Sequence, residues 1–383
     1  MKQCLNVTDV SAVPQQTCSE LEGCPERTRR IVEATLPGAR ILRAVTMGPD
    51  LRSSDESTKG AGYGIPVRVD VVQAGVHRSV VLHTACHNAF GHDRRSDRAA
   101  AAMLAADTFG SIPKHVQVLD VGAYTGDDSF ASLRNTGEFY VLSSYAEGDP
   151  YANDLRQVAV TGELAPKDIA RAHLLVEYLV ELHALRPPNP KTAYERFVRD
   201  TLGSGEGIFG ITDSYPDDVP AAPRSRLERI EEACLRWRFR LRKRTHRLRR
   251  THGDFHPFNV VFNEHSELAV LDASRGGSGD PADDVSCLAI NYAFFSLGRT
   301  GAWRHALGQL WHECWSGYST LTYDDELFEV VPPLLAWRGL VLASPAWYPD
   351  LSAMDRDRLL SFIERVLTSD RFSPNMAGEY FDT

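Results

Sequence analysis

The stretch HGDFHPFNVVFNEHSELAVLDASRGGSGDPADD, residues 252–284, is the part of the chain that indicates its fold. In it the carboxylate of Asp254 is followed five residues later by the carboxamide of Asn259. Two short apolar runs come next, and the turn-forming residues 263–266 separate them, which predicts a β-hairpin. The second run ends in Asp272. The hairpin would therefore place Asp272 at a strand end that faces the same cleft as Asp254 and Asn259.

These residue types suit phosphoryl transfer. Their order matches the catalytic-loop pattern H-x-D-x-x-x-x-N. Magnesium prefers hard oxygen ligands and usually takes only one or two of them from the protein, so Asn259 and Asp272 would suffice as metal ligands. Asp254 would then orient or deprotonate an acceptor hydroxyl, while the metal neutralises charge on the phosphates.

The segment resembles the aminoglycoside phosphotransferase and choline kinase group, whose members carry HGDxxxxN, a later metal aspartate and a G-D-P-x-x-D run. Here that run is residues 279–284. The resemblance implies an α+β, two-lobed protein-kinase-like fold with a small β-rich N-lobe and a larger, mostly helical C-lobe. It also implies Mg²⁺ as cofactor, ATP or GTP as phosphoryl donor, and a small-molecule acceptor such as an amino sugar, an aminoglycoside-like antibiotic or a related metabolite.

Other interpretations of the same residues remain open. His252 and His256 flank Asp254 and could bind zinc or another transition metal. We expect His252 instead to hydrogen-bond the loop backbone. Asp280 and Asp284 could be catalytic, but aspartates beside glycine and proline commonly cap helices or fix turns. Asp280 is therefore expected to begin a helix.

Length and composition favour a cytoplasmic enzyme. A chain of 383 residues, 43% of them hydrophobic, is long enough for two or three cores. The net charge of -9 argues against a nucleic-acid partner and mildly favours a cationic or neutral substrate. Seven scattered cysteines without a CxxC pair are typical of free thiols in a reducing compartment. The polar N-terminus and the lack of a long apolar run predict no secretory signal and no membrane partner. The oligomeric state is left open.

The predicted N-lobe covers residues 26–148, and a structureless arm that could move, residues 1–25, precedes it. Valine-rich alternation and helical periodicity predict the following elements: helices at 26–36 and 95–108, and strands at 40–47, 65–73 and 78–84. Residues 138–148 are expected to be the strand that enters a kinase-like hinge, where Tyr145 and Ala146 would bind the adenine edge.

The N-lobe departs from the family pattern at the phosphate site. His83 lies on the strand that normally presents a lysine to the α and β phosphates, and Asp97 in the following helix could keep the imidazole charged. Lys59 in the glycine-rich loop 58–64 is the other candidate cation, and backbone N–H groups of that loop could also bind phosphate. The departure leaves two alternatives: a nucleotide-binding protein that does not transfer phosphate, or an enzyme with another donor or chemistry.

The predicted C-lobe covers residues 149–383. Apolar spacing predicts a helix at 167–185, and acids followed by bases predict another at 225–249. The glycine-rich residues 203–216 are expected to form a substrate-side loop or lid. Four acids could face either a cationic substrate or water: Asp154, Asp213, Asp217 and Asp218. Five tryptophans are expected to pack in the core: Trp303, Trp311, Trp315, Trp337 and Trp347.

Overall fold

A computed structural model describes residues 26–47, 63–125 and 129–382. The chain divides into two compact units, Met1–Leu142 and Ser143–Thr383. The boundary predicted from the sequence lay after residue 148. The predicted arm, residues 1–25, and the candidate cation Lys59 lie outside the described residues.

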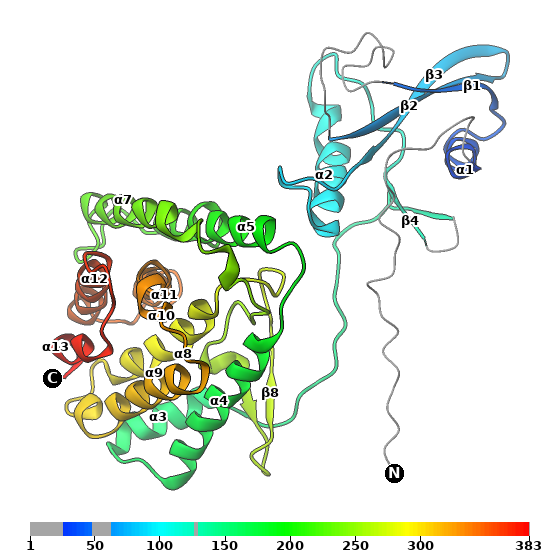
Figure 1. The fold of residues 1–383 in the computed structure, drawn as a ribbon. Coiled ribbons are helices and arrows are strands. Elements are labelled where there is room, and N and C mark those ends of the chain that lie inside the picture. Colours follow the sequence, from blue (N-terminus) through cyan, green and yellow to red (C-terminus); the bar gives the residue numbers. More distant parts are fainter. Residues whose placement is uncertain (1–25, 48–62, 126–128, 383) are drawn as a thin grey trace, which may run out of the picture. The chain divides into compact units, whose positions relative to one another are not determined.

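The first unit contains a three-stranded antiparallel sheet in the order β1-β2-β3 (Figure 1). Its strands are β1 (Arg40–Thr46), β2 (Gly64–Gln73) and β3 (Val76–Ala85). Alternate valines of β2 point to one face, where they pack against the apolar side of helix α1 (Glu26–Thr35). Ala74 and Gly75 both have positive φ, which makes the tight turn between β2 and β3.

Helix α2 (Arg95–Thr108) and a small hairpin, β4 (Gly122–Tyr124) with β5 (Phe130–Ser132), complete the unit. The predicted hinge strand at residues 138–148 is wrong. Residues 136–147 are irregular, and no strand in the described part of the chain pairs with them. Their large apolar side chains, such as Val141, are exposed, so neither a ladder nor a core stabilises an extended strand there.

The second unit is mostly helical, with a small antiparallel sheet in the order β6-β7-β8. The sheet consists of β6 (Asp149–Pro150), β7 (Val260–Phe262) and β8 (Leu268–Val270). The helices are α3 (Tyr151–Thr161), α4 (Pro166–Ala184), α5 (Pro190–Gly203), α6 (Ile208–Asp213), α7 (Arg224–Leu241), α8 (Pro281–Ser296), α9 (Gly308–Thr322), α10 (Leu327–Val330), α11 (Pro332–Ala343), α12 (Ala353–Leu367) and α13 (Gly378–Phe381). The α+β prediction is confirmed: an antiparallel sheet is followed by a mainly helical remainder.

Helix α8 is the centre of the larger core. Nearly all its residues are buried, and it packs against α3, α9 and α11 (Figure 1). A helix that is buried on nearly all sides needs other elements around it, and its buried polar side chains need partners there. Four of the five tryptophans are buried in this unit, as predicted, whereas Trp347 is 55% exposed.

Two predicted elements differ in extent. The helix expected at 225–249 ends at Leu241, and only a 3-10 turn, Thr245–Arg247, follows it. Beyond the end of the helix, Arg247 points inward to a buried ion pair with Asp280. The glycine-rich segment 203–216 contains the short helix α6 and is not wholly a loop. No helix in the described ranges is long and apolar enough to cross a membrane.

Candidate active site

The loop that carries Asp254 is tied to the chain after β8. Gly253 has a φ of 83°, a conformation that glycine adopts without steric cost. A Cβ at this position would lie 2.6 Å from the carbonyl oxygen of Ser274, so the close approach also requires glycine. The backbone N–H of Ser274 donates to the carbonyl of His252 at 2.8 Å. The two predicted halves of the site are therefore joined by backbone contacts.

Asp284 supports the same loop from helix α8. Its carboxylate accepts hydrogen bonds from the backbone N–H groups of His252 at 2.7 Å and Gly253 at 2.8 Å. The buried imidazole of His183 lies 3.1 Å from the carboxylate and 2.8 Å from the hydroxyl of Tyr318. Burial opposes ionisation, but His183 and the two N–H groups outweigh it and lower the pKa of Asp284. Asp284 thus holds the loop.

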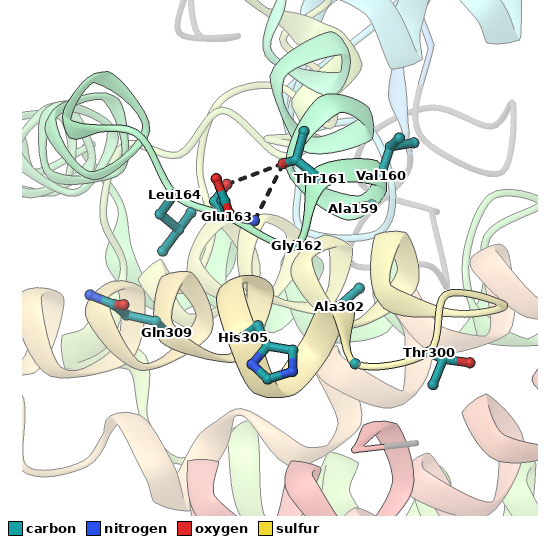
Figure 2. Close-up of a pocket in the computed structure, with 11 residues that line it drawn as sticks. Ala159, Val160, Thr161, Gly162, Glu163, Leu164, Thr300, Ala302, His305 and Gln309 are labelled. Carbon is teal, nitrogen blue, oxygen red and sulfur yellow. Dashed lines mark hydrogen bonds between the residues drawn. The ribbon is translucent and has the colours of Figure 1, made fainter.

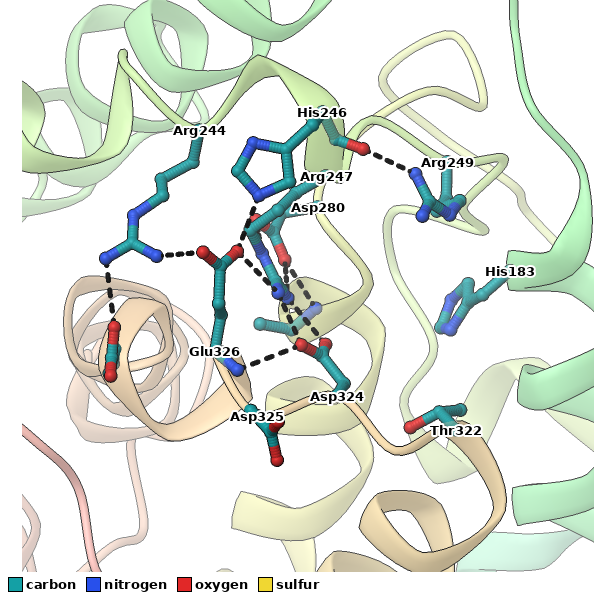
Figure 3. Close-up of polar contacts among 12 residues, drawn as sticks. His183, Arg244, His246, Arg247, Arg249, Asp280, Thr322, Asp324, Asp325 and Glu326 are labelled. Carbon is teal, nitrogen blue, oxygen red and sulfur yellow. Dashed lines mark hydrogen bonds and ion pairs between the residues drawn. The ribbon is translucent and has the colours of Figure 1, made fainter.

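Asp280 is structural as well. Its side chain caps α8 by accepting from the N–H of Ala282 at 3.0 Å, as the sequence predicted. It also accepts from Tyr194 at 2.7 Å and from Arg247 at 2.8 and 2.9 Å. Arg247 donates in turn to Asp324 (Figure 3). A carboxylate so fully occupied by protein partners is not available to a substrate.

Asp254 meets an arginine that sequence reasoning did not identify. The Nη1 of Arg338, on α11, donates to its Oδ1 at 2.7 Å, and the Nη2 donates to the carbonyl of Gly253 at 2.8 Å. The same guanidinium binds Asp283 at 2.7 Å. The Nε2 of His256 lies 3.5 Å from the other carboxylate oxygen, Oδ2. Arg338 is distant in sequence and belongs to no local motif, so no sequence signal pointed to it.

Two neighbouring aspartates have opposite pKa shifts. Burial alone would raise the pKa of Asp254, but the hydrogen bond from His256 and the charges of Arg338 and Arg275 hold it well below its usual range. Burial and the adjacent charge of Asp284 raise the pKa of Asp283 to about 6 in spite of Arg338. At neutral pH Asp254 is therefore an ionised, weakly basic group, suited to orienting a hydroxyl and accepting its proton late.

Asn259 and Asp272 lie where a magnesium ion could bind. The amide nitrogen of Asn259 donates to the backbone carbonyl of Asp254 at 3.1 Å, which leaves its oxygen as the group for a ligand. The N–H of Leu271 donates to the backbone carbonyl of Asn259 at 2.9 Å, so the next residue, Asp272, follows beside the loop. Asp272 is exposed and has a φ of 52°, uncommon for a residue other than glycine. One amide oxygen and one carboxylate fit magnesium.

The zinc alternative has no support in this geometry. His252 is buried, and its Nδ1 accepts from the backbone N–H of Asp254 at 3.3 Å, as predicted for a structural histidine. The Nδ1 of His256 accepts from the N–H of Phe258 at 3.2 Å. The described ranges contain no group of three or more His, Cys, Asp or Glu side chains that could hold a metal.

The residues predicted to bind nucleotide lie in different parts of the chain, unlike the residues of the catalytic loop. His83 is an exposed residue of β3, paired with Pro66, and its Nε2 lies 3.1 Å from where a Cβ of Gly64 would be. Asp97 accepts from the N–H of Arg94 at the start of α2. Tyr145 is 86% exposed, and like Ala146 it lies in the irregular segment where a strand was expected. His83 belongs to the first unit, whereas Tyr145 and Asp254 belong to the second.

Two cavities open on the second unit, and neither is lined by Asp254, Asn259 or Asp272. One, of about 750 Å³, lies beside the end of α3, where the hydroxyl of Thr161 exchanges hydrogen bonds with the backbone of Glu163 (Figure 2). The other, of about 450 Å³, adjoins the ion pairs of Arg247 (Figure 3).

Among the comparisons with known proteins, the match to a family model agrees with the motif. No curated protein matches the chain. Among solved structures, one titled "Glucosamine kinase (crystal form B)" is similar over 88% of this chain and 95% of its own, with 12% identity and a TM-score of 0.33. The sequence model of the phosphotransferase enzyme family matches residues 85–321, which include Asp254, Asn259 and Asp272 and cover more than half of the chain. The chain therefore belongs to this phosphotransferase enzyme family.

Proposed function

We propose that the protein transfers the γ-phosphate of ATP, or of GTP, to a hydroxyl of a small molecule. The observation that supports the proposal is the joined loop. The side-chain amide of Asn259 donates to the carbonyl of Asp254, and the N–H of Leu271, the residue before Asp272, donates to the carbonyl of Asn259. A protein that only binds a ligand has no chemical need for an oriented carboxylate beside two oxygen ligands for a metal.

In the proposed step the acceptor oxygen attacks the γ-phosphorus. The bond from that phosphorus to the β–γ bridging oxygen breaks, and the nucleoside diphosphate leaves with its electron pair. Oδ1 of Asp254 accepts a hydrogen bond from Arg338 at 2.7 Å, whereas Oδ2 lies at the longer distance of 3.5 Å from the imidazole of His256. Oδ2 is therefore the oxygen that would orient the hydroxyl. The proton passes to Asp254 as the new ester bond forms, because a weak base accepts it only late in the reaction.

Asn259 and Asp272 are the proposed magnesium ligands. Bound magnesium supplies charge neutralisation on the phosphates. The amide nitrogen of Asn259 fixes the orientation of its oxygen through the carbonyl of Asp254. The ligand and the catalytic carboxylate are thus held by the same loop, so a shift of one moves the other.

The donor site is proposed to lie in residues 26–148, the N-lobe, with residues 149–383 as the C-lobe and acceptor side. His83 or Lys59 would contact the phosphates, and Tyr145 and Ala146 would lie beside the adenine. A nucleotide-binding protein without transfer, or an enzyme with another donor, is the second candidate. The observation that favours it is His83 itself, an exposed imidazole where the family pattern has a lysine.

The test is a coupled assay for nucleoside diphosphate release with a panel of hydroxylated acceptors, followed by mass spectrometry of the products. We expect an acceptor-dependent gain of one phosphate in the wild type. Asp254→Asn should abolish turnover and leave Mg-ATP binding nearly intact, because Asp254 contacts the acceptor and not the metal. Equal loss of binding and turnover would contradict the role given to Asp254.

A further inference from the structure

A cluster of aromatic rings adjoins the catalytic loop. It consists of Phe258 on the loop, Phe294 and Phe295 at the end of α8, and Tyr348 after α11. The ring centroid of Phe295 lies 6.0 Å from that of Phe258 and 5.7 Å from that of Phe294, and the centroid of Phe294 lies 4.6 Å from that of Tyr348. All four side chains are partly exposed. We name these four residues the aromatic cluster. Partly exposed rings in mutual contact offer an apolar surface to a ligand.

The aromatic cluster lies close to Asp254. The ring of His256, whose Nε2 is 3.5 Å from the Asp254 carboxylate, is 5.7 Å from the ring of Phe258. At the other end of the cluster, burial and the nearby carboxylate of Asp254 raise the pKa of Tyr348 to about 12. The aromatic cluster is therefore within reach of a molecule that places a hydroxyl at Asp254.

The protein cations near the aromatic cluster already occupy aromatic faces. The guanidinium of Arg156, on α3, lies 5.2 Å from the centroid of Phe258. Those of Arg275 and Arg338 lie 4.3 and 4.0 Å from the centroid of Trp337. A ligand ammonium could also be attracted to an aromatic face, but here it would lie beside like charges.

Arg156 differs from the other arginines in its partners. Arg338 is neutralised by Asp254 and Asp283. Arg156 is exposed and donates to the neutral side-chain oxygen of Asn153 at 2.7 Å. No carboxylate in the described part of the chain forms an ion pair with it. Its positive charge is therefore available to an anionic group of a ligand.

The acids that would attract a cationic acceptor are directed elsewhere. Asp154 pairs with Lys167 and Arg171, and Asp217 pairs with Arg224. The two remaining candidates from the sequence are exposed on α6 and in the turn after it: Asp213 and Asp218. Beside the aromatic cluster, the carboxylate of Asp254 is paired with Arg338, whereas Arg156 pairs with no carboxylate in the described part of the chain.

We propose that the aromatic cluster and Arg156 form the acceptor subsite, which takes a hydroxylated compound with an apolar face and an anionic group, and not a polyamine. This inference rests on the proposed phosphotransfer. The family resemblance implied a cationic, aminoglycoside-like acceptor, whereas the acceptor proposed here is anionic.

The test uses three related probes, each with a phenyl ring and a hydroxyl: 3-phenyllactate with a carboxylate, 3-phenyl-1,2-propanediol without charge, and phenylalaninol with an ammonium group. Dissociation constants are measured by saturation-transfer NMR on the full chain. We expect phenyllactate to bind about tenfold more tightly than phenylalaninol, with the diol between them. Arg156→Ala should remove the preference, and Arg156→Lys should retain it. Arg236→Ala, at an exposed arginine of α7, is the matched control.

Any one of four results would overturn the inference: equal binding of the three probes, no measurable binding of any probe, a preference for phenylalaninol, or a preference that persists in Arg156→Ala. A parallel titration of Mg-ATP and an assay with kanamycin separate it from the proposed function. Phosphorylation of kanamycin would uphold phosphotransfer and refute the anionic subsite. Failure to bind Mg-ATP, with the phenyllactate preference intact, would refute phosphotransfer and leave an anion-binding site.

Discussion

Arg338 Nη1 donates to Asp254 Oδ1 at 2.7 Å, and the two residues are 84 positions apart. Arg338 lies on α11, beyond residues 85–321 that match the family, and is buried between Asp254, Asp283 and Trp337. A buried guanidinium with two carboxylate partners has a fixed orientation. Arg338 is therefore a positioning residue: it fixes the rotamer of Asp254 and keeps the carboxylate ionised.

Removing the Arg338 charge should change the pH dependence of the reaction. In Arg338→Met the half-buried carboxylate of Asp254 keeps His256 but loses the positive charge of Arg338, so its pKa should rise by at least about one unit. The acidic limb of the kcat/KM profile should move upward by the same amount, whereas the wild-type limb from Asp254 should lie below its ordinary pKa of 3.8. Steady-state assays that extend down to the lowest pH at which both proteins stay folded measure this shift.

Arg338→Lys is the matched variant, because it keeps a charge but not the planar donor geometry. Arg338→Lys should keep the acidic limb of the kcat/KM profile close to its wild-type position, and it should lower kcat because Asp254 is misoriented. An Arg338→Met enzyme that folds, as shown by circular dichroism, and has an unshifted profile would argue against the positioning role.

Asp284 should be needed for stability. Asp284→Ala leaves two backbone N–H groups and the buried His183 without their acceptor. The free energy of unfolding should fall by about 3 kcal/mol. Urea denaturation measures it, with the exposed Asp213→Ala as control. A loss no larger than that of the control would show that the loop is held by other contacts.

The raised pKa of Asp283 predicts that the free energy of unfolding depends on pH. Its pKa of about 6 lies above the ordinary 3.8, so the folded protein binds this proton more tightly than the unfolded chain. Protonation of Asp283 therefore stabilises the fold increasingly as the pH falls from about 6 to about 4. Between pH 7 and 5 the wild type should gain about 1 kcal/mol relative to Asp283→Asn, in which the group cannot titrate. If the free energy of unfolding changed with pH equally in the two proteins, the proton would be bound by a group other than Asp283.

His83 and Lys59 give a kinetic prediction for the donor site. If the imidazole replaces the missing lysine, His83→Ala should raise the KM for ATP several-fold and His83→Lys should lower it. If Lys59 has that task, Lys59→Ala should produce the increase. His77→Ala, an exposed histidine of the same strand, is the control. An unchanged KM in both alanine variants would assign phosphate binding to backbone N–H groups.

The sequence predicted the elements whose signals are local. Alternating valines identified β2, and the Asp254-to-Asn259 spacing with its turn identified the loop and the β7–β8 hairpin, because both depend on neighbours in the chain. The strand predicted at residues 138–148 is wrong for the opposite reason, since a strand requires a partner that the sequence does not reveal. Arg338 could not be found because its partners are set by the packing of α11 against α8.

Calorimetric titration of Mg-ATP and Mg-GTP into the wild type and into Asp272→Ala, with and without magnesium, is the decisive measurement for a metal-dependent phosphotransferase site. Asp213→Ala serves as the matched loss of an exposed carboxylate. We expect magnesium-dependent nucleotide binding in the wild type and in Asp213→Ala, and its loss in Asp272→Ala. Nucleotide binding that is the same with and without Asp272, or no binding of either nucleotide to the wild type, would contradict a metal-dependent phosphotransferase site at Asp254.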